Sequence, residues 1–125
     1  MPVRERRRLI FLLVAAALSL VSGCGHTQVI RGDRTLYVAL NDYRVAPQSV
    51  RVSSGQATIF VHNYGRLTHN LVVSLHGQSI GSTRPIWPGQ SAELTLSLVP
   101  GTYLMASTIL SDQALGEYGT LKVTS

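Results

Sequence analysis

Hydrophobic and polar residues alternate with a period of two along most of the chain after residue 35. Apolar side chains occupy every second position in segments 36–41, 50–53 and 94–98. This alternation is typical of a β-strand that buries one face and leaves the other in water. No segment has the spacing of an amphipathic helix of ten residues. The pattern therefore predicts an all-β fold.

Turn-forming residues separate these runs at short intervals. The chain has such pairs at Ser54-Gly55, His76-Gly77, Pro88-Gly89 and Pro100-Gly101. Seven or eight short strands joined by turns favour a single antiparallel Greek-key β-sandwich. About 100 residues follow the N-terminal segment described next, which is enough for one domain with one modest core.

The N-terminal segment has the layout of a secretory signal peptide. Four arginines between residues 4 and 8 precede an apolar run at 9–21, and small residues then lead to Cys24. The apolar run is shorter than the roughly 20 residues that a membrane-spanning helix needs. The alternatives are an ordinary cleaved signal with an incidental cysteine, or an uncleaved anchor helix.

The residues around Cys24 resemble the bacterial lipobox, in which the cysteine is lipidated and becomes the new N-terminus. This resemblance implies a signal peptide at 1–23, a lipidated tether at 24–34 and a folded domain at 35–125. The protein would be attached by lipid on Cys24 to the cell membrane or the outer membrane, facing the periplasm or the extracellular side.

The charge of the chain is concentrated in the signal segment. The whole sequence has 11 basic and 6 acidic residues, but four arginines and Glu5 lie in the signal. The remaining seven basic and five acidic residues give a net charge of +2 and form no basic run. This distribution argues against a nucleic-acid partner. Because Cys24 is the only cysteine, an intramolecular disulfide is excluded.

Three stretches of the predicted sandwich resemble the cupredoxins, the blue-copper β-sandwich family. They are Val61-His62-Asn63 leading to Thr68-His69-Asn70-Leu71, the turn Trp87-Pro88-Gly89, and Pro100-Gly101-Thr102-Tyr103 with the segment that follows to Val123. The resemblance covers nearly all of the predicted domain and implies the cupredoxin fold. It also implies that His69 stands at the first copper-ligand position.

The other three copper-ligand positions of the family hold different residues here. Ser107 stands where the cysteine is expected, Asp112 where the histidine is expected, and Glu117 where the methionine is expected. A blue-copper centre needs a soft thiolate, and a serine hydroxyl is hard and stays protonated near neutral pH. The resemblance therefore implies a degenerate copper site, and electron transfer is the least favoured function.

Two functions remain open for such a domain. The first is a non-redox binding or accessory module without a cofactor, with Trp87 as a candidate contact for a protein partner in the cell envelope. Trp87 could instead cover the end of the core. The second is a re-specified site for one copper(II) or zinc ion at His69, Ser107, Asp112 and Glu117, because one imidazole with carboxylates is a harder donor set than the original.

An enzymatic function is not expected. Ser107, His69 and Asp112 are the residue types of a hydrolase triad, but the sequence lacks a nucleophile elbow of the Gly-x-Ser-x-Gly type. We therefore assign no catalytic residue.

Overall fold

A computed structural model describes residues 26–125. The predicted signal peptide and Cys24 lie outside these residues. Within the described part there are ten strands, and no helix long and apolar enough to cross a membrane. The strands are β1 (Gln28–Val29), β2 (Thr35–Asn41), β3 (Arg44–Ala46), β4 (Ser49–Ser53), β5 (Gly55–Asn63), β6 (Val72–Leu75), β7 (Gln78–Ser82), β8 (Ser91–Leu98), β9 (Gly101–Ala106) and β10 (Tyr118–Thr124).

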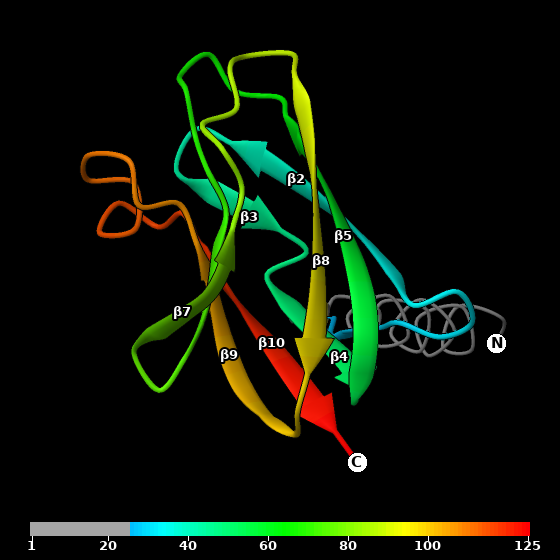
Figure 1. Ribbon diagram of the computed structural model, residues 1–125. Helices are drawn as coiled ribbons and strands as arrows, with labels where there is room; N and C mark the ends of the chain where they lie inside the picture. The colour runs from blue at the N-terminus through cyan, green and yellow to red at the C-terminus, as the bar shows by residue number, and fades with distance from the viewer. Residues whose placement is uncertain (1–25) are drawn as a thin grey trace, which may run out of the picture.

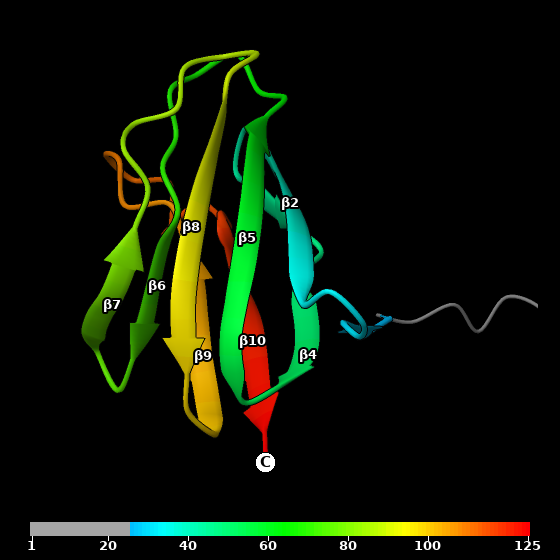
Figure 2. The same ribbon diagram turned by 45° about the vertical axis from the view of Figure 1, so that its right-hand side comes forward.

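The strands form two sheets that pack face to face (Figures 1 and 2). The larger sheet has the order β1-β4-β10-β9-β6-β7, and the smaller has the order β3-β2-β5-β8. Five of the eight neighbouring pairs are antiparallel, whereas β1–β4, β4–β10 and β2–β5 are parallel. The structure thus confirms the predicted all-β sandwich.

The core lies between the two sheets and consists largely of the alternate apolar residues of the predicted strands, joined by Val45, Ala57 and Ile86. In β2, for example, Leu36, Val38 and Leu40 are buried while Tyr37 and Asn41 are exposed. Burying one such aliphatic side chain stabilises the fold by about 1.5–3 kcal/mol. The core comprises Leu36, Val38, Leu40, Val45, Val50, Val52, Ala57, Ile59, Val61, Leu71, Val73, Ile86, Leu96, Leu98, Tyr103, Met105, Leu121 and Val123.

Three short strands were not expected from the sequence. β1 and β3 have only two and three residues, and all but one residue of β7 is exposed, so none of them shows a clear alternation. β1 lies inside the segment expected to be a tether. It pairs in parallel with β4, and the Ile30 amide extends this pairing by donating to the Arg51 carbonyl.

The topology gathers several connections at one end of the sandwich. β2 and β5 run in the same direction, so the turn after Asn41 and the segment after Asn63 leave the sheet at the same end. Ala106 and Tyr118 pair across β9 and β10, so the loop at 107–117 also begins and ends there. This convergence positions the candidate site.

Candidate metal site

His69 is at the centre of a cluster of buried polar side chains at this end of the sandwich. It precedes β6 and forms a β-bridge with Ile86, in which each residue's amide donates to the other's carbonyl. The bridge fixes the His69 backbone, and the imidazole is completely buried. A buried polar ring needs hydrogen-bond partners, and carboxylates supply them on both sides.

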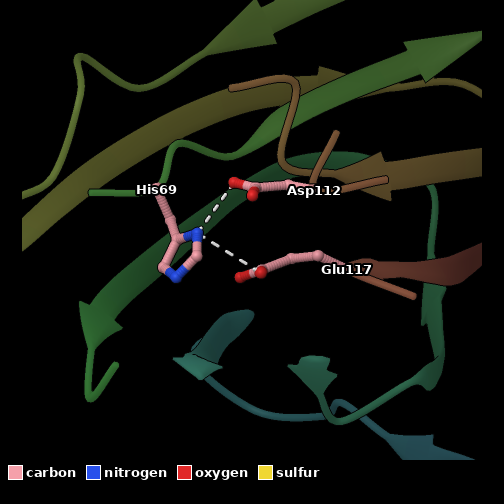
Figure 3. Close-up of side chains that lie close together, drawn as sticks. All are labelled: His69, Asp112 and Glu117. Carbon is pink, nitrogen blue, oxygen red and sulfur yellow. Dashed lines mark hydrogen bonds and ion pairs between the residues drawn. The ribbon is translucent and has the colours of Figure 1, made fainter. Parts of the chain in front are cut away.

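Two carboxylates face the Nδ1 atom of His69. Asp112 Oδ2 lies 2.8 Å from His69 Nδ1, and Glu117 Oε2 lies 3.3 Å from it. Figure 3 shows both carboxylates directed at the same ring nitrogen, Asp112 from the loop and Glu117 from the segment that leads into β10. One potential ligand atom from each of the three buried residues lies within 4.8 Å of the others. These are three of the four positions that the sequence predicted.

Ser107, the fourth predicted position, contacts Asp112 rather than His69. Its buried hydroxyl donates to Asp112 Oδ2 at 2.6 Å and accepts from the Asn70 amide at 3.2 Å. Ser107 therefore holds Asp112 in place. A hydrolase triad needs the serine bonded to the histidine. In the described structure Ser107 and His69 each hydrogen-bond to Asp112 and not to each other, so the three residues do not form the serine–histidine–aspartate chain of a hydrolase triad.

Asp42, which the sequence analysis did not select, bonds to the opposite side of the His69 ring. Its Oδ1 atom lies 2.9 Å from His69 Nε2. Asp42 is itself held by the Arg66 and Leu67 amides, which donate to its carboxylate. A carboxylate at Nε2 holds a proton on that nitrogen, so a metal ion that displaces the proton from Nδ1 would leave Nδ1 free to coordinate it beside Asp112 and Glu117.

Glu117 is a buried carboxylate with incomplete hydrogen bonding. Its Oε2 atom accepts from the Tyr43 amide at 2.8 Å. Its Oε1 atom, also buried, has no hydrogen-bond partner in the described structure. Burial raises the pKa of Glu117 to about 7, although the nearby His69 and the Tyr43 amide oppose this shift. An unsatisfied buried carboxylate is costly unless a cation or proton compensates it.

The carboxylates shift the pKa of His69 in the opposite sense to its burial. Burial lowers this pKa, but the hydrogen bonds to Asp112 and Asp42, together with the charge of Glu117, outweigh burial and raise the pKa of His69 above its ordinary value. The bond from His69 and the Arg66 amide lower the pKa of Asp42. The cluster thus attracts a positive charge to the position between His69 Nδ1 and its two carboxylates.

This donor set fits a divalent ion of intermediate or hard character. Zinc bonds imidazole nitrogen and carboxylate oxygen at about 2.0–2.2 Å, so ligand atoms around a tetrahedral ion lie roughly 3.4 Å apart. The separation of His69 Nδ1 from Glu117 Oε2, 3.3 Å, is close to that value, whereas Asp112 Oδ2, at 2.8 Å, lies at hydrogen-bond distance and would move outward on metal binding. The set does not fit a blue-copper centre, because a serine hydroxyl occupies the thiolate position.

Trp87 lies next to the site but points into solvent. Its neighbour Ile86 is buried and bridges to His69, whereas the Trp87 side chain is 65% exposed. The exposed indole is thus not buried as a cover over the core. Contact with a partner stays a prediction.

Several solved structures have a similar fold. A reduced auracyanin from the photosynthetic bacterium Roseiflexus castenholzii matches with a TM-score of 0.68 at 19% identity, over 76% of this chain and 100% of that chain. Rusticyanin matches with a TM-score of 0.64 at 16% identity, over 82% of this chain and 87% of that chain.

Auracyanin A, described as a "blue" copper protein from Chloroflexus aurantiacus, also matches. Its TM-score is 0.64 at 16% identity, over 77% of this chain and 99% of that chain. No protein-family model and no curated protein sequence matches the chain. The structural likenesses confirm the predicted cupredoxin-like fold, and at these identities they show the fold alone.

The prediction of a domain without a cofactor is wrong. The cluster of His69, Asp112 and Glu117 places three potential ligand atoms together in the interior. The fold is shared with a protein described as a blue-copper protein. Metal binding at these positions was the alternative that the sequence left open, because the replacements include carboxylates that can bind a metal ion beside His69.

Proposed function

We propose that this protein is a lipid-anchored, extracytoplasmic cupredoxin-like domain that binds one divalent metal ion, copper(II) or zinc, at His69, Asp112 and Glu117. The observation that carries the proposal is the convergence of these three buried side chains on one point, with Glu117 Oε1 left without a partner. When bound, the ion neutralises the buried carboxylates.

Each residue of the site has a separate role in this proposal. His69 supplies Nδ1, while Asp42 holds the proton on Nε2 and thereby keeps Nδ1 available. Asp112 and Glu117 supply carboxylate oxygens. Ser107 and the Tyr43 amide orient these two carboxylates. The surrounding residues thus prepare the ligands without binding the ion themselves.

The donor set supports handling or sensing of a metal ion rather than rapid electron transfer. Nitrogen and oxygen ligands stabilise copper(II) and zinc, whereas copper(I) prefers sulfur. Residues 26–125 contain one methionine and no cysteine, and that methionine, Met105, is packed in the core outside the cluster. The domain would hold its ion in one oxidation state.

A second candidate function is docking of a protein partner at the same end of the sandwich. The observation in its favour is that Trp87, Tyr64 and Leu67 are all largely exposed near the His69 segment. Exposed aromatic side chains are common anchors in protein interfaces. Metal binding and docking are compatible, because Trp87 is not among the metal ligands.

Metal retention tests the proposal. The full-length protein, purified without chelator, is loaded separately with Cu(II) and Zn(II), desalted and analysed for metal. We expect about one ion per chain, lost in His69→Ala. The matched control is His62→Ala, because His62 bonds to Ser91 and belongs to no part of the cluster. Equal retention in His69→Ala, or none in the unmodified chain, would overturn the proposed site.

A further inference from the structure

Four basic residues gather at the end of the sandwich where the described chain begins. Arg31, Arg34 and Arg51 line an open cavity of about 440 Å³, which Ser53 and Thr124 also border. Lys122 is the register partner of Arg51 across β10 and β4, and both side chains are exposed. Partners in register point to the same side of a sheet. We call Arg31, Arg34, Arg51 and Lys122 the basic face.

The basic face has little negative charge to compensate it. The six strands of the larger sheet contain no aspartate or glutamate. Arg34 is fixed by hydrogen bonds to the Gln56 carbonyl and to Ser53, which are all neutral acceptors. No carboxylate of the described residues forms an ion pair with the four cations. Only Asp33 lies nearby in sequence, so the face has a local charge of about +3.

The position of β1 places this face close to the predicted lipid. Gln28 is paired with Val50 of β4, so the chain is attached to the domain from that residue onward. Cys24 is only four residues earlier. Four extended residues span at most about 14 Å. A lipid on Cys24 would therefore hold the basic face within reach of the headgroup layer.

We propose that the basic face binds the anionic phospholipid headgroups of the membrane that carries the lipid anchor. This inference rests on the anchoring part of the proposed function. Each Lys or Arg near an anionic membrane surface favours binding about fivefold, which corresponds to about 1 kcal/mol. A lipid anchor with a basic patch is a two-signal arrangement, in which the anchor sets the attachment and the patch sets the orientation.

The orientation would direct the metal site away from the membrane. β5 starts at Gly55, beside Arg34, and ends at Asn63, whose carbonyl accepts a hydrogen bond from Gly89. Nine strand residues span about 30 Å. Trp87 is two residues before Gly89 and is the only tryptophan of the chain. It therefore reports the height of the metal-site end above the membrane.

Energy transfer from Trp87 to a headgroup-labelled lipid measures this height. The full-length protein, processed in bacteria and carrying its lipid, is reconstituted into vesicles of phosphatidylglycerol or of phosphatidylcholine. We expect low transfer in phosphatidylglycerol and at least twofold higher transfer in phosphatidylcholine. The variant Arg31→Gln/Arg51→Gln/Lys122→Gln should show the higher value in both lipids, because it lacks three charges of the face.

The matched control, Arg44→Gln/Arg66→Gln/Arg84→Gln, loses the same charge outside the basic face and should behave as the unmodified protein. Equal transfer in the two lipids, as expected if the face binds an acidic protein instead, would overturn the inference. So would equal effects of the two triple variants. Mass spectrometry of the same sample reports the lipid on Cys24. Its absence would overturn both the anchor and the inference, while metal retention would be unaffected.

Discussion

Each ring nitrogen of His69 faces a carboxylate, and this pairing decides how the site handles protons and metal. Without a metal, the ring nitrogens hydrogen-bond to Asp42 at Nε2 and to Asp112 at Nδ1, and these bonds favour the protonated ring. When a metal ion binds Nδ1, the proton on that nitrogen must leave. The proton on Nε2 remains there, hydrogen-bonded to Asp42. Metal and proton therefore compete for one atom.

Replacing Asp42 with asparagine tests its role in keeping Nδ1 available. Loss of a carboxylate that orients a metal-binding histidine weakens affinity by about 10- to 100-fold. We expect that decrease for Zn(II) in Asp42→Asn, measured by competition with a chelating dye. Asp33→Asn, which removes the same charge far from His69, should leave the affinity unchanged. Equal affinities for Asp42→Asn and the unmodified protein would contradict this role.

The pKa of Glu117 gives a pH dependence for the metal-free protein. The pKa of Glu117 in the folded protein is about 7, and the pKa of His69 is also raised above its ordinary value. The folded state therefore binds more protons than the unfolded chain, so the free energy of unfolding decreases as pH rises from about 5 to 8. The contribution of Glu117 is at most roughly 3 kcal/mol.

Glu117→Gln removes that contribution because glutamine does not ionise. Denaturant unfolding of the metal-free variant should show a weaker decrease in stability between pH 5 and 8 than the unmodified protein shows. Some decrease should remain, because the raised pKa of His69 acts in the same direction. An unchanged pH profile would mean that Glu117 is not a desolvated carboxylate.

At this scale the sequence selected three residues that lie together, but it did not reveal the contacts that hold them. His69, Asp112 and Glu117 were selected through the family resemblance, and they do lie together. Ser107 was selected as a ligand position, but its hydroxyl donates to Asp112. Asp42 was missed because an aspartate after a strand is typical of an ordinary turn. Its contact with His69 depends on two segments 27 residues apart.

The connections at the site end are held by side-chain to backbone hydrogen bonds. The buried Asn63, at the end of β5, donates to the carbonyls of Leu67 and Ile86 and accepts from the Gly65 amide. These bonds fix the segment that leads to His69. They also bring Gly65 against Asp42, where a side chain at residue 65 would meet the Asp42 carboxylate and backbone.

Gly65→Ala should therefore disturb the metal site through its supporting loop. The added methyl group would displace Asp42 from His69 and destabilise the protein by about 1–3 kcal/mol, as overpacking commonly does. Denaturant unfolding measures the stability, and a Zn(II) titration measures the accompanying loss of affinity. A variant with unchanged stability and affinity would show that Asp42 can move without consequence.

The elements with regular alternation were predictable, and the short ones were not. Hydrophobic alternation in β2, β4, β5, β8 and β10 depends on burial of one face, so it is visible in the sequence. β1 and β7 are mostly exposed and leave no such pattern. They are held by pairing to a neighbouring strand, and a pairing partner cannot be identified from a few residues of local sequence.

The molecule as a whole has two chemically different ends. The site end combines buried carboxylates with exposed aromatic residues, whereas the opposite end carries the basic face and the start of the described chain. Figure 1 shows the start of the coloured chain, from residue 26, on the opposite side of the sandwich from the loop at 107–117. A membrane attachment at Cys24 would leave the metal site accessible from solution.

The attachment itself is a prediction from the signal segment and is tested at Cys24. Mass spectrometry of the protein purified from bacteria should show a chain that begins at Cys24 and carries a diacylglyceryl group. Cys24→Ala should lack this mass and should no longer be processed at residue 24. A mature chain that starts elsewhere, with an unmodified cysteine, would contradict the lipoprotein interpretation.

The most direct test of the account is anomalous X-ray diffraction from a crystal of the zinc-loaded protein, measured on both sides of the zinc absorption edge. The account predicts one strong peak within about 2.1 Å of His69 Nδ1, bonded also to Asp112 and Glu117. No peak at the cluster, or a peak only at another histidine such as His26, His62 or His76, would contradict it.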